Sequence, residues 1–140
     1  MACLEAADSK LTDLSSKSTM ENNGWSFDTN KNKESHFKST CDMHDTWYGF
    51  KYPGVGTVSS TFTGSGTAIL DYGNCHNIGE VHVYLNGILT DVAYKNTPSK
   101  QITFDFFPND VLLISETNND AIIKLNSLKL TCKGERFFYA

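Results

Sequence analysis

The residues best suited to chemistry in this chain are aromatic rings and amide, carboxylate and imidazole side chains. A pyranose ring presents apolar C–H groups to an aromatic face and hydroxyl groups to Asn, Asp and His. The alternating run Trp47-Tyr48-Gly49-Phe50-Lys51-Tyr52 supplies the aromatic rings. Because side chains alternate along a strand, Trp47 and Tyr48 point to opposite faces. If the tyrosine face is buried, Trp47 is the platform for a ligand, and if Trp47 is buried, Tyr48 and Tyr52 are; an aromatic-rich core strand is the alternative.

Polar groups that could orient a ligand lie around the loop at 72–79, which contains Gly73 and Asn74, and on the strand that follows it. In the expected strand at 80–86, Val81, Val83 and Leu85 share one face. The alternating residues His82, Tyr84 and Asn86 then lie on the outward face. The simpler reading is that these polar residues only hydrogen-bond a loop. As a ligand-binding cluster, the sequence predicts, besides Trp47 and Tyr48, the residues Asp71, Asn74, His76, Asn77, Tyr84 and Asn86.

The spacing of possible ligand residues suggests two metal sites. Asp28, Asn30 and Asn32 match the opening of a calcium loop, but Lys33 stands where such a loop needs glycine and Ser39 where it needs a bidentate acid, which excludes an EF-hand. A looser calcium site at Asp28, Asn30 and Asn32 is the expectation that survives. The other reading, zinc held by Cys41, His44, Cys75 and His76, does not match the ligand spacing of zinc fingers or ribbons.

Catalysis finds little support in the sequence. The four histidines and the acidic residues lie scattered, and Gly64-Ser65-Gly66 is not the Gly-x-Ser-x-Gly nucleophile motif. Asp71 and His76 could act as acid and base in a hydrolase, which we rank below binding. We therefore expect that the protein is not an enzyme.

Charge and hydropathy exclude two classes of partner. The 140 residues hold 12 Lys and Arg against 16 Asp and Glu, so there is no basic stripe for nucleic acid. No apolar run approaches the roughly 20 residues that a membrane helix requires, and residues 1–10 lack the features of a signal peptide. If the protein is secreted, its signal has been removed or lies outside this sequence.

Four cysteines suit an oxidising compartment. Since four cysteines allow three complete pairings, spacing cannot choose among them. We expect a Cys75–Cys132 disulfide that ties the end of the chain to its middle, with Cys41–Cys132 as the alternative.

From residue 24 onward the chain consists of short aromatic and β-branched segments separated by Gly, Asn, Asp and Pro. Asn86-Gly87 is a hairpin signal, and the apolar run Val111–Ile114 predicts a central strand. The pattern predicts an all-β fold, an antiparallel two-sheet jelly-roll sandwich. The expected strands are Trp25–Asp28, Ser35–Thr40, Thr46–Tyr52, Thr57–Thr63, Gly66–Tyr72, Glu80–Asn86, Leu89–Tyr94, Gln101–Phe106, Val111–Glu116, Ala121–Leu125 and Ser127–Cys132.

The two ends are expected to lie outside the sandwich of residues 24–134. Residues 1–23 are polar, and Leu4, Leu11 and Leu14 are spaced like the seam of a short helix, so this stretch is either a disordered lead-in or a short helix that brings copies together as a homo-oligomer. Residues 135–140, with three successive aromatic side chains, form a tail or an edge strand.

Several of these segments, taken in order, resemble the galactose-binding-like jelly-roll modules used by many lectins and carbohydrate-binding modules. The resemblance extends from Trp25 to Cys132. The segments that carry it are Trp47-Tyr48-Gly49-Phe50, Gly64-Ser65-Gly66-Thr67-Ala68, Leu70-Asp71-Tyr72-Gly73-Asn74-Cys75, Val83-Tyr84-Leu85-Asn86-Gly87, Phe104-Asp105-Phe106 and Asn126-Ser127-Leu128.

The resemblance implies a non-catalytic glycan-binding domain whose site lies in the loops at one end or on a sheet face. Its expected partners are glycans or glycoproteins outside the cell or at its surface, with calcium assisting. The alternative is a structural or adhesion sandwich, of a virion or of the extracellular matrix, that acts through protein–protein contacts.

Overall fold

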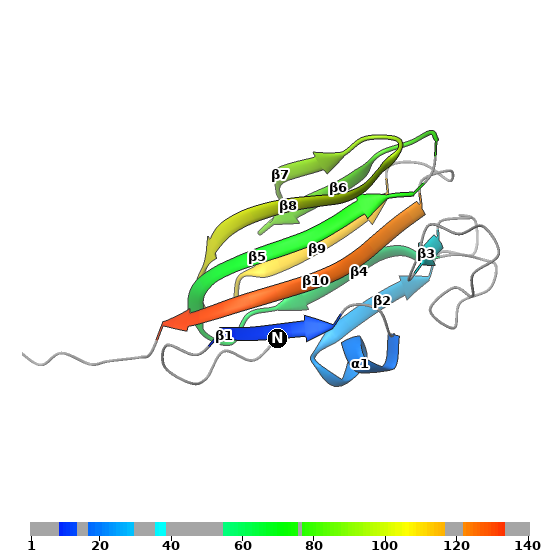
Figure 1. The fold of residues 1–140 in the computed structure, drawn as a ribbon. Coiled ribbons are helices and arrows are strands. Elements are labelled where there is room, and N and C mark those ends of the chain that lie inside the picture. The colour runs from blue at the N-terminus through cyan, green and yellow to red at the C-terminus, as the bar shows by residue number, and fades with distance from the viewer. Residues whose placement is uncertain are drawn as a thin grey trace, which may run out of the picture.

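Two β-sheets packed face to face make up the fold (Figure 1). This computed structural model describes residues 9–13, 17–29, 36–38, 55–75, 77–116 and 122–133. Sheet A contains, in spatial order, β1 (Ser9–Asp13), β10 (Ile122–Lys133), β5 (Ser65–Asn74) and β8 (Thr97–Phe106), and β3 (His36–Lys38) also pairs with β10. Sheet B contains β2 (Trp25–Thr29), β4 (Val55–Thr61), β9 (Val111–Glu116), β6 (Val81–Leu85) and β7 (Ile88–Ala93). The expected all-β sandwich is confirmed.

The core forms where the inward faces of the two sheets meet. In β5, Ala68, Leu70 and Tyr72 are fully buried, and the residues between them are only partly buried. The same alternation buries Val81 and Val83 of β6. Removal of this apolar surface from water is the main force that holds the sheets together. The buried core consists of Met20, Trp25, Val58, Phe62, Ala68, Leu70, Tyr72, Val81, Val83, Ala93, Phe106, Leu112, Ile114, Ile123, Leu125, Leu128, Leu130 and Cys132.

Strand β9 lies at the centre of sheet B, as its apolar run predicted. Leu112 and Ile114 are fully buried between the sheets. Val111, on the other face, keeps 38% of its surface exposed. The outer face of sheet B therefore retains apolar side chains in contact with water.

The turn between β6 and β7 confirms the hairpin signal. Asn86 has φ 53° and Gly87 has φ 78°, both in the left-handed region. A two-residue turn with positive φ at both positions matches the twist of antiparallel strands, and Asn-Gly is its preferred sequence. This turn sets which residues of β6 and β7 stand opposite each other.

Strand β10 is one long strand where the sequence predicted two, at Ala121–Leu125 and Ser127–Cys132. Leu125 pairs with Tyr72 and Ser127 with Asp71, so Asn126 is an extra residue in a β-bulge. A bulge bends a strand without ending it. The polar Asn126 therefore interrupts the alternation but not the strand.

Among the strands that the structure describes, one pair of neighbours departs from the antiparallel arrangement: β3 runs parallel to β10. Strand β3 occupies His36–Lys38, inside the expected strand at Ser35–Thr40. It pairs with residues 122–124 of β10, and β1 pairs with residues 127–131. Because β5 occupies the other side of β10, the two short strands follow one another along the same edge.

The expectation that residues 1–23 stand apart from the sandwich is wrong for the part that the structure describes. Residues 9–13 form β1, and Leu11 stands opposite Lys129 of β10, so it belongs to a sheet and not to a helical seam. A helix, α1 (Lys17–Asn22), follows and lies beside β2 (Figure 1). Its Met20 is fully buried in the core. Gly24, with φ 89°, then turns the chain into β2.

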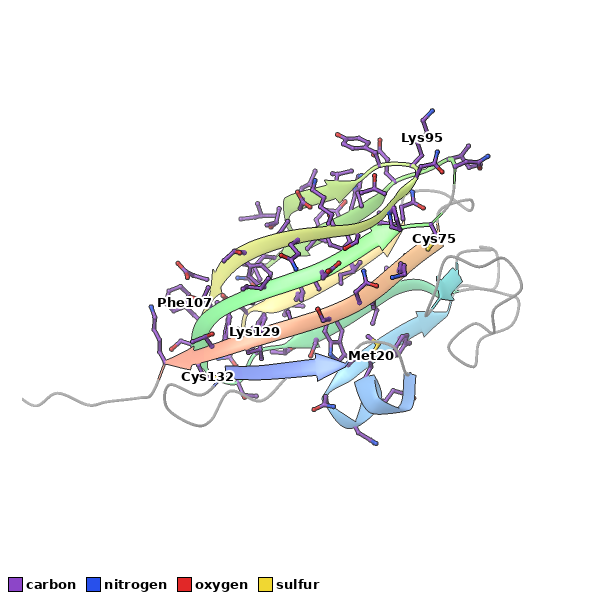
Figure 2. All side chains as sticks on the ribbon, viewed as in Figure 1. Met20, Cys75, Lys95, Phe107, Lys129 and Cys132 are labelled. Carbon is purple, nitrogen blue, oxygen red and sulfur yellow. The ribbon has the colours of Figure 1, made fainter. Side chains whose placement is uncertain are left out.

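The expected Cys75–Cys132 disulfide is wrong, although both cysteines are disulfide-bonded. Cys132 stands opposite Gly66, near the start of β5, whereas Cys75 follows Asn74, the last residue of that strand. Nine residues of extended chain separate the two positions by about 30 Å, and a disulfide requires Cα atoms within about 7 Å. Figure 2 shows the two cysteines at opposite ends of sheet A. Each therefore belongs to a different bridge.

Two other expected elements lie outside the described residues: the aromatic strand at 46–52 and the tail at 135–140. Within the described part of the chain, no helix combines the length and the apolar character that a membrane crossing requires.

Candidate functional site

A row of side chains crosses all five strands on the outer face of sheet B. Tyr84 of β6 stands directly opposite Leu89 of β7 on one side and Leu113 of β9 on the other. The row continues from Leu113 to Ser59 of β4 and from Ser59 to Ser26 of β2. We call Leu89, Tyr84, Leu113, Ser59 and Ser26 the Tyr84 row. With strands about 4.8 Å apart, it extends for about 19 Å.

The Tyr84 row faces away from the core. Val83, Leu112 and Ile114 are fully buried, so the residues that alternate with them, Tyr84 and Leu113, lie on the outer face. Leu89 keeps 50% of its surface exposed, while Tyr84 and Leu113 are partly buried. The row is apolar at its β7 end and carries hydroxyl groups at its β2 end.

Three side chains at alternate positions form a hydrogen-bonded series that ends at Tyr84: Glu80 lies just before β6, and His82 and Tyr84 lie within it. Glu80, His82 and Tyr84 alternate, so all three lie on the outer face. The Nε2 atom of His82 lies 2.8 Å from the Oε1 atom of Glu80, and its Nδ1 atom lies 3.1 Å from the Tyr84 hydroxyl. The rings of His82 and Tyr84 are also close, with centroids 6.0 Å apart. These contacts hold the Tyr84 ring in one orientation.

Asn86 joins the hairpin end to the turn between β8 and β9. Its Nδ2 atom donates to the Asp110 carboxylate at 2.8 Å, and its Oδ1 atom accepts from the Val111 amide at 2.8 Å. The Asp110 carboxylate also accepts from the Phe107 amide at 2.9 Å. Asn86 was expected to bind a ligand, but its side chain instead connects two turns.

Asp71 lies on the opposite side of the molecule from Tyr84. Its neighbours Leu70 and Tyr72 point into the core, so Asp71 faces outward from sheet A. Its Oδ1 atom accepts from Ser99 Oγ at 2.7 Å and from Asn126 Nδ2 at 2.9 Å, and Lys124 Nζ donates to Asn126. This network fastens the β10 bulge across β5 to β8. The prediction that Asp71 joins Tyr84 and Asn86 in one cluster is wrong, because the core separates them.

Asn74 and Asn77 lie in the third part of the expected cluster, at the end of β5. Asn74 is fully buried, and its Nδ2 atom donates to the carbonyl oxygens of Ile78 at 3.3 Å and Gly79 at 3.1 Å. It shapes the loop that leads into β6, whereas Asn77 is exposed in that loop. Only Tyr84 of the described ligand residues presents an aromatic ring on a sheet face.

Of the six remaining predicted site residues, the structure describes one, Asp28. Trp47, Tyr48, His76, Asn30 and Asn32 lie outside the described residues. Asp28 lies in β2, where it pairs with Thr57. Among the described side chains, no group of three or more His, Cys, Asp or Glu is placed to hold a metal ion.

A second polar cluster lies between the sheets and has a structural role. The Tyr72 hydroxyl donates to Asp91 Oδ2 at 2.5 Å, and Lys100 Nζ lies 3.1 Å from Asp91 Oδ1. Burial, followed by the hydrogen bond and the charge of Asp91, raises the pKa of the Tyr72 hydroxyl far above its ordinary value. A phenol that holds its proton this firmly is a donor that joins the sheets and a poor acid or base.

The polar neighbours of Tyr84 were only partly foreseen. Alternation places His82 and Tyr84 on the outward face, and the same rule, applied two residues earlier, adds Glu80. The sequence analysis missed the other members of the row, because they come from other strands: Leu89, Leu113, Ser59 and Ser26. Their alignment depends on register, which period-two patterning does not define.

No protein-family model and no curated protein matches the sequence. Among solved structures, the chain is similar to the CBM35 from Cellvibrio japonicus Abf62, at 15% identity and a TM-score of 0.49, covering 90% of this chain and 94% of that one. It is similar to a family 35 carbohydrate-binding module from an environmental isolate, at 14% identity and a TM-score of 0.49, covering 89% and 94%. A third match is the CBM36-1 domain of a multidomain xylanase from the hindgut metagenome of Trinervitermes trinervoides, at 13% identity and a TM-score of 0.43, covering 91% and 99%.

These matches are carbohydrate-binding modules, the class named by the resemblance in sequence. At such identities and TM-scores the similarity assigns no role to any residue of this protein.

Proposed function

We propose that the protein is a non-catalytic carbohydrate-binding domain whose site is the Tyr84 row. The observation that carries the proposal is the row itself: an aromatic ring between two leucines, continued by two serines, on the outer face of a sheet. The apolar end suits the C–H face of a sugar ring, and the hydroxyl end suits its hydroxyl groups. A span of about 19 Å is longer than a single pyranose ring, so the row suits an oligosaccharide.

The arrangement supports binding better than catalysis. In the hydrogen-bonded series Glu80, His82 and Tyr84, both nitrogens of the central imidazole are engaged by its two neighbours. Asp71, the acid considered for a hydrolase, is held by Ser99 and Asn126 on the far side of the molecule. These contacts favour a fixed recognition surface.

A glycan array followed by titration calorimetry tests the proposal. The Tyr84→Ala variant should lose binding by tenfold or more, because the aromatic ring of the row is removed. Tyr94→Ala is the matched control, since Tyr94 lies just beyond β7 and is 60% exposed, outside the row. If wild type binds no glycan, or if both variants bind as well as wild type does, the proposal fails.

Calcium is the finer part of the proposal. The sequence motif Asp28, Asn30 and Asn32 supplies the oxygen ligands that calcium prefers. Strand β2, which carries Asp28, also carries Ser26 of the row. Running the array with calcium and with a chelator tests whether the ion supports binding. The expected ligands are glycans or glycoproteins outside the cell or at its surface.

A second candidate function, adhesion through protein contacts, is favoured by exposed apolar side chains at two turns. Ile88 is 71% exposed and Phe107 is 62% exposed, and both lie beside the turns that Asn86 and Asp110 join. Concentration-dependent assembly that is lost in an Ile88→Ser, Phe107→Ser variant, without any glycan binding by wild type, would favour this function.

A further inference from the structure

The direction of the hydrogen bonds around His82 determines what Tyr84 can offer to a ligand. An ionised carboxylate only accepts hydrogen bonds, so the contact of Glu80 Oε1 with His82 Nε2 places a proton on Nε2. In the neutral imidazole, a proton on Nε2 leaves Nδ1 without one, so Nδ1 is an acceptor. The Tyr84 hydroxyl therefore donates its own hydrogen to Nδ1, at 3.1 Å. What remains for a ligand is the oxygen of Tyr84, acting as an acceptor.

The two sheets also differ in their content of positively charged residues. None of the five strands of sheet B contains a lysine or an arginine. The strands of sheet A contain six lysines: Lys10, Lys38, Lys100, Lys124, Lys129 and Lys133. Beside Tyr84 the described charge is the carboxylate of Glu80, whose side chain is 42% exposed.

The groups that face His82 from neighbouring strands add no positive charge. Val92 of β7 and Ser115 of β9 stand opposite His82. Asp91, the next residue of β7, points into the core toward Tyr72. On the strands of sheet B, the described residues around Tyr84 are therefore neutral or negative, and Lys100, which reaches the Val92 carbonyl from sheet A, is paired with Asp91.

We propose that the Tyr84 row selects uncharged glycans and rejects uronic-acid and sulfated sugars. This inference rests on the proposed carbohydrate-binding function. A sugar hydroxyl can donate a hydrogen bond to the Tyr84 oxygen and to the Glu80 carboxylate. A ligand carboxylate or sulfate can only accept, so it would meet two acceptors and a like charge. Binding of such a charged group is unfavourable, because it would lose hydrogen bonds to water and gain no donor from the protein.

The test uses pairs of polysaccharides that differ only in charge. Amylose, cellulose, mannan and galactan are immobilised beside the same polymers with their C6 hydroxymethyl groups oxidised to carboxylates, and binding is measured at pH 8 and low salt. Wild type should bind at least one neutral polymer and bind its oxidised form at least tenfold more weakly.

Two variants locate the origin of the selectivity. Glu80→Gln keeps an oxygen that accepts from His82 Nε2 but removes the charge, so the preference for the neutral form should fall at least threefold. Asp105→Asn removes one negative charge from the outer face of sheet A, where Asp105 accepts from Thr67 at 3.0 Å, and should leave the preference unchanged. Circular dichroism of each variant checks that it is folded.

The outcomes separate the two proposals. Equal or tighter binding of the oxidised polymer, lost in Tyr84→Ala, would overturn the selectivity and leave the binding function standing. An unchanged preference in Glu80→Gln would also overturn it. Absence of binding to every polymer and to the glycan array would overturn the function itself.

Discussion

The hydroxyl of Tyr72 and the carboxylate of Asp91 join the two sheets across the core. Tyr72 belongs to β5 of sheet A and Asp91 to β7 of sheet B, and the hydroxyl donates to Oδ2 at 2.5 Å. Lys100 of β8 binds the same carboxylate and also donates to the Val92 carbonyl at 2.9 Å. This cluster links the edge strands β7 and β8, which belong to different sheets.

Tyr72→Phe should change how stability depends on alkaline pH. The pKa of Tyr72 is raised in the folded protein, so above about pH 10 the unfolded chain loses this proton while the folded chain keeps it. The wild-type free energy of unfolding therefore falls as pH rises above 10, by at most about 1.4 kcal/mol per pH unit from this group, and is unaffected below that range.

In Tyr72→Phe that alkaline loss should be smaller than in wild type. At pH 7 the variant should be less stable by about 1–3 kcal/mol, because Asp91 loses a hydrogen bond inside the molecule. Urea unfolding between pH 7 and 11 measures both effects, with Tyr94→Phe as the exposed control. Parallel curves for wild type and Tyr72→Phe above pH 10 would contradict the prediction.

Asn86→Ala should cost more stability than Asn96→Ala. Both asparagines have positive φ, 53° and 55°, so each substitution places alanine in the left-handed region at a cost of about 1–2 kcal/mol. Asn86 loses in addition its bonds to Asp110 and Val111, each contributing about 1 kcal/mol. Thermal unfolding of the two variants side by side measures the difference, and equal losses would show that the side-chain bonds contribute nothing.

Gly73→Ala should be strongly destabilising. A Cβ atom there would lie 2.2 Å from the Thr97 carbonyl oxygen and 2.5 Å from Pro98, both backbone atoms of β8. Backbone cannot move aside cheaply, so we expect a loss of about 3 kcal/mol or more. Gly87→Ala, where nothing lies within 4 Å but φ is +78°, should cost only about 1–2 kcal/mol. Similar unfolding free energies for the two variants would contradict the close approach at Gly73.

Peptide mapping without reduction tests the separation of the two disulfides. Digestion of the monomer should release no peptide that joins Cys75 to Cys132, because they lie at opposite ends of sheet A. The chain contains only two other cysteines, Cys3 and Cys41, so bridges to these must account for both. A linked Cys75–Cys132 peptide from monomeric protein would contradict the register of β5 and β10.

Period-two patterning was sufficient to predict the sandwich, because it depends on which residues of a strand are buried. Val81 and Val83 show this directly: they were predicted to share one face of their strand, and both are fully buried. The segment at 9–13 gave no such signal, since the polar sequence Ser-Lys-Leu-Thr-Asp forms a strand only because the edge of β10 supplies hydrogen-bond partners.

The predicted site failed for a different reason. Asp71 and Tyr84 are both outward-facing, but alternation does not say from which sheet, and they lie on opposite sides of the molecule. The disulfide prediction failed in the same way, because it ignored how far β5 travels between Gly66 and Cys75. Strand pairing over long sequence distances decides both questions, and no local pattern contains it.

The Tyr84 row takes one residue from each of five hydrogen-bonded strands, so its spacing is the spacing of the sheet. Such a platform is preorganised: the conformational entropy of arranging its side chains was lost when the protein folded, and little more is lost on association. A stiff oligosaccharide would then meet a surface that needs no rearrangement, and its residence time would depend on the contacts alone.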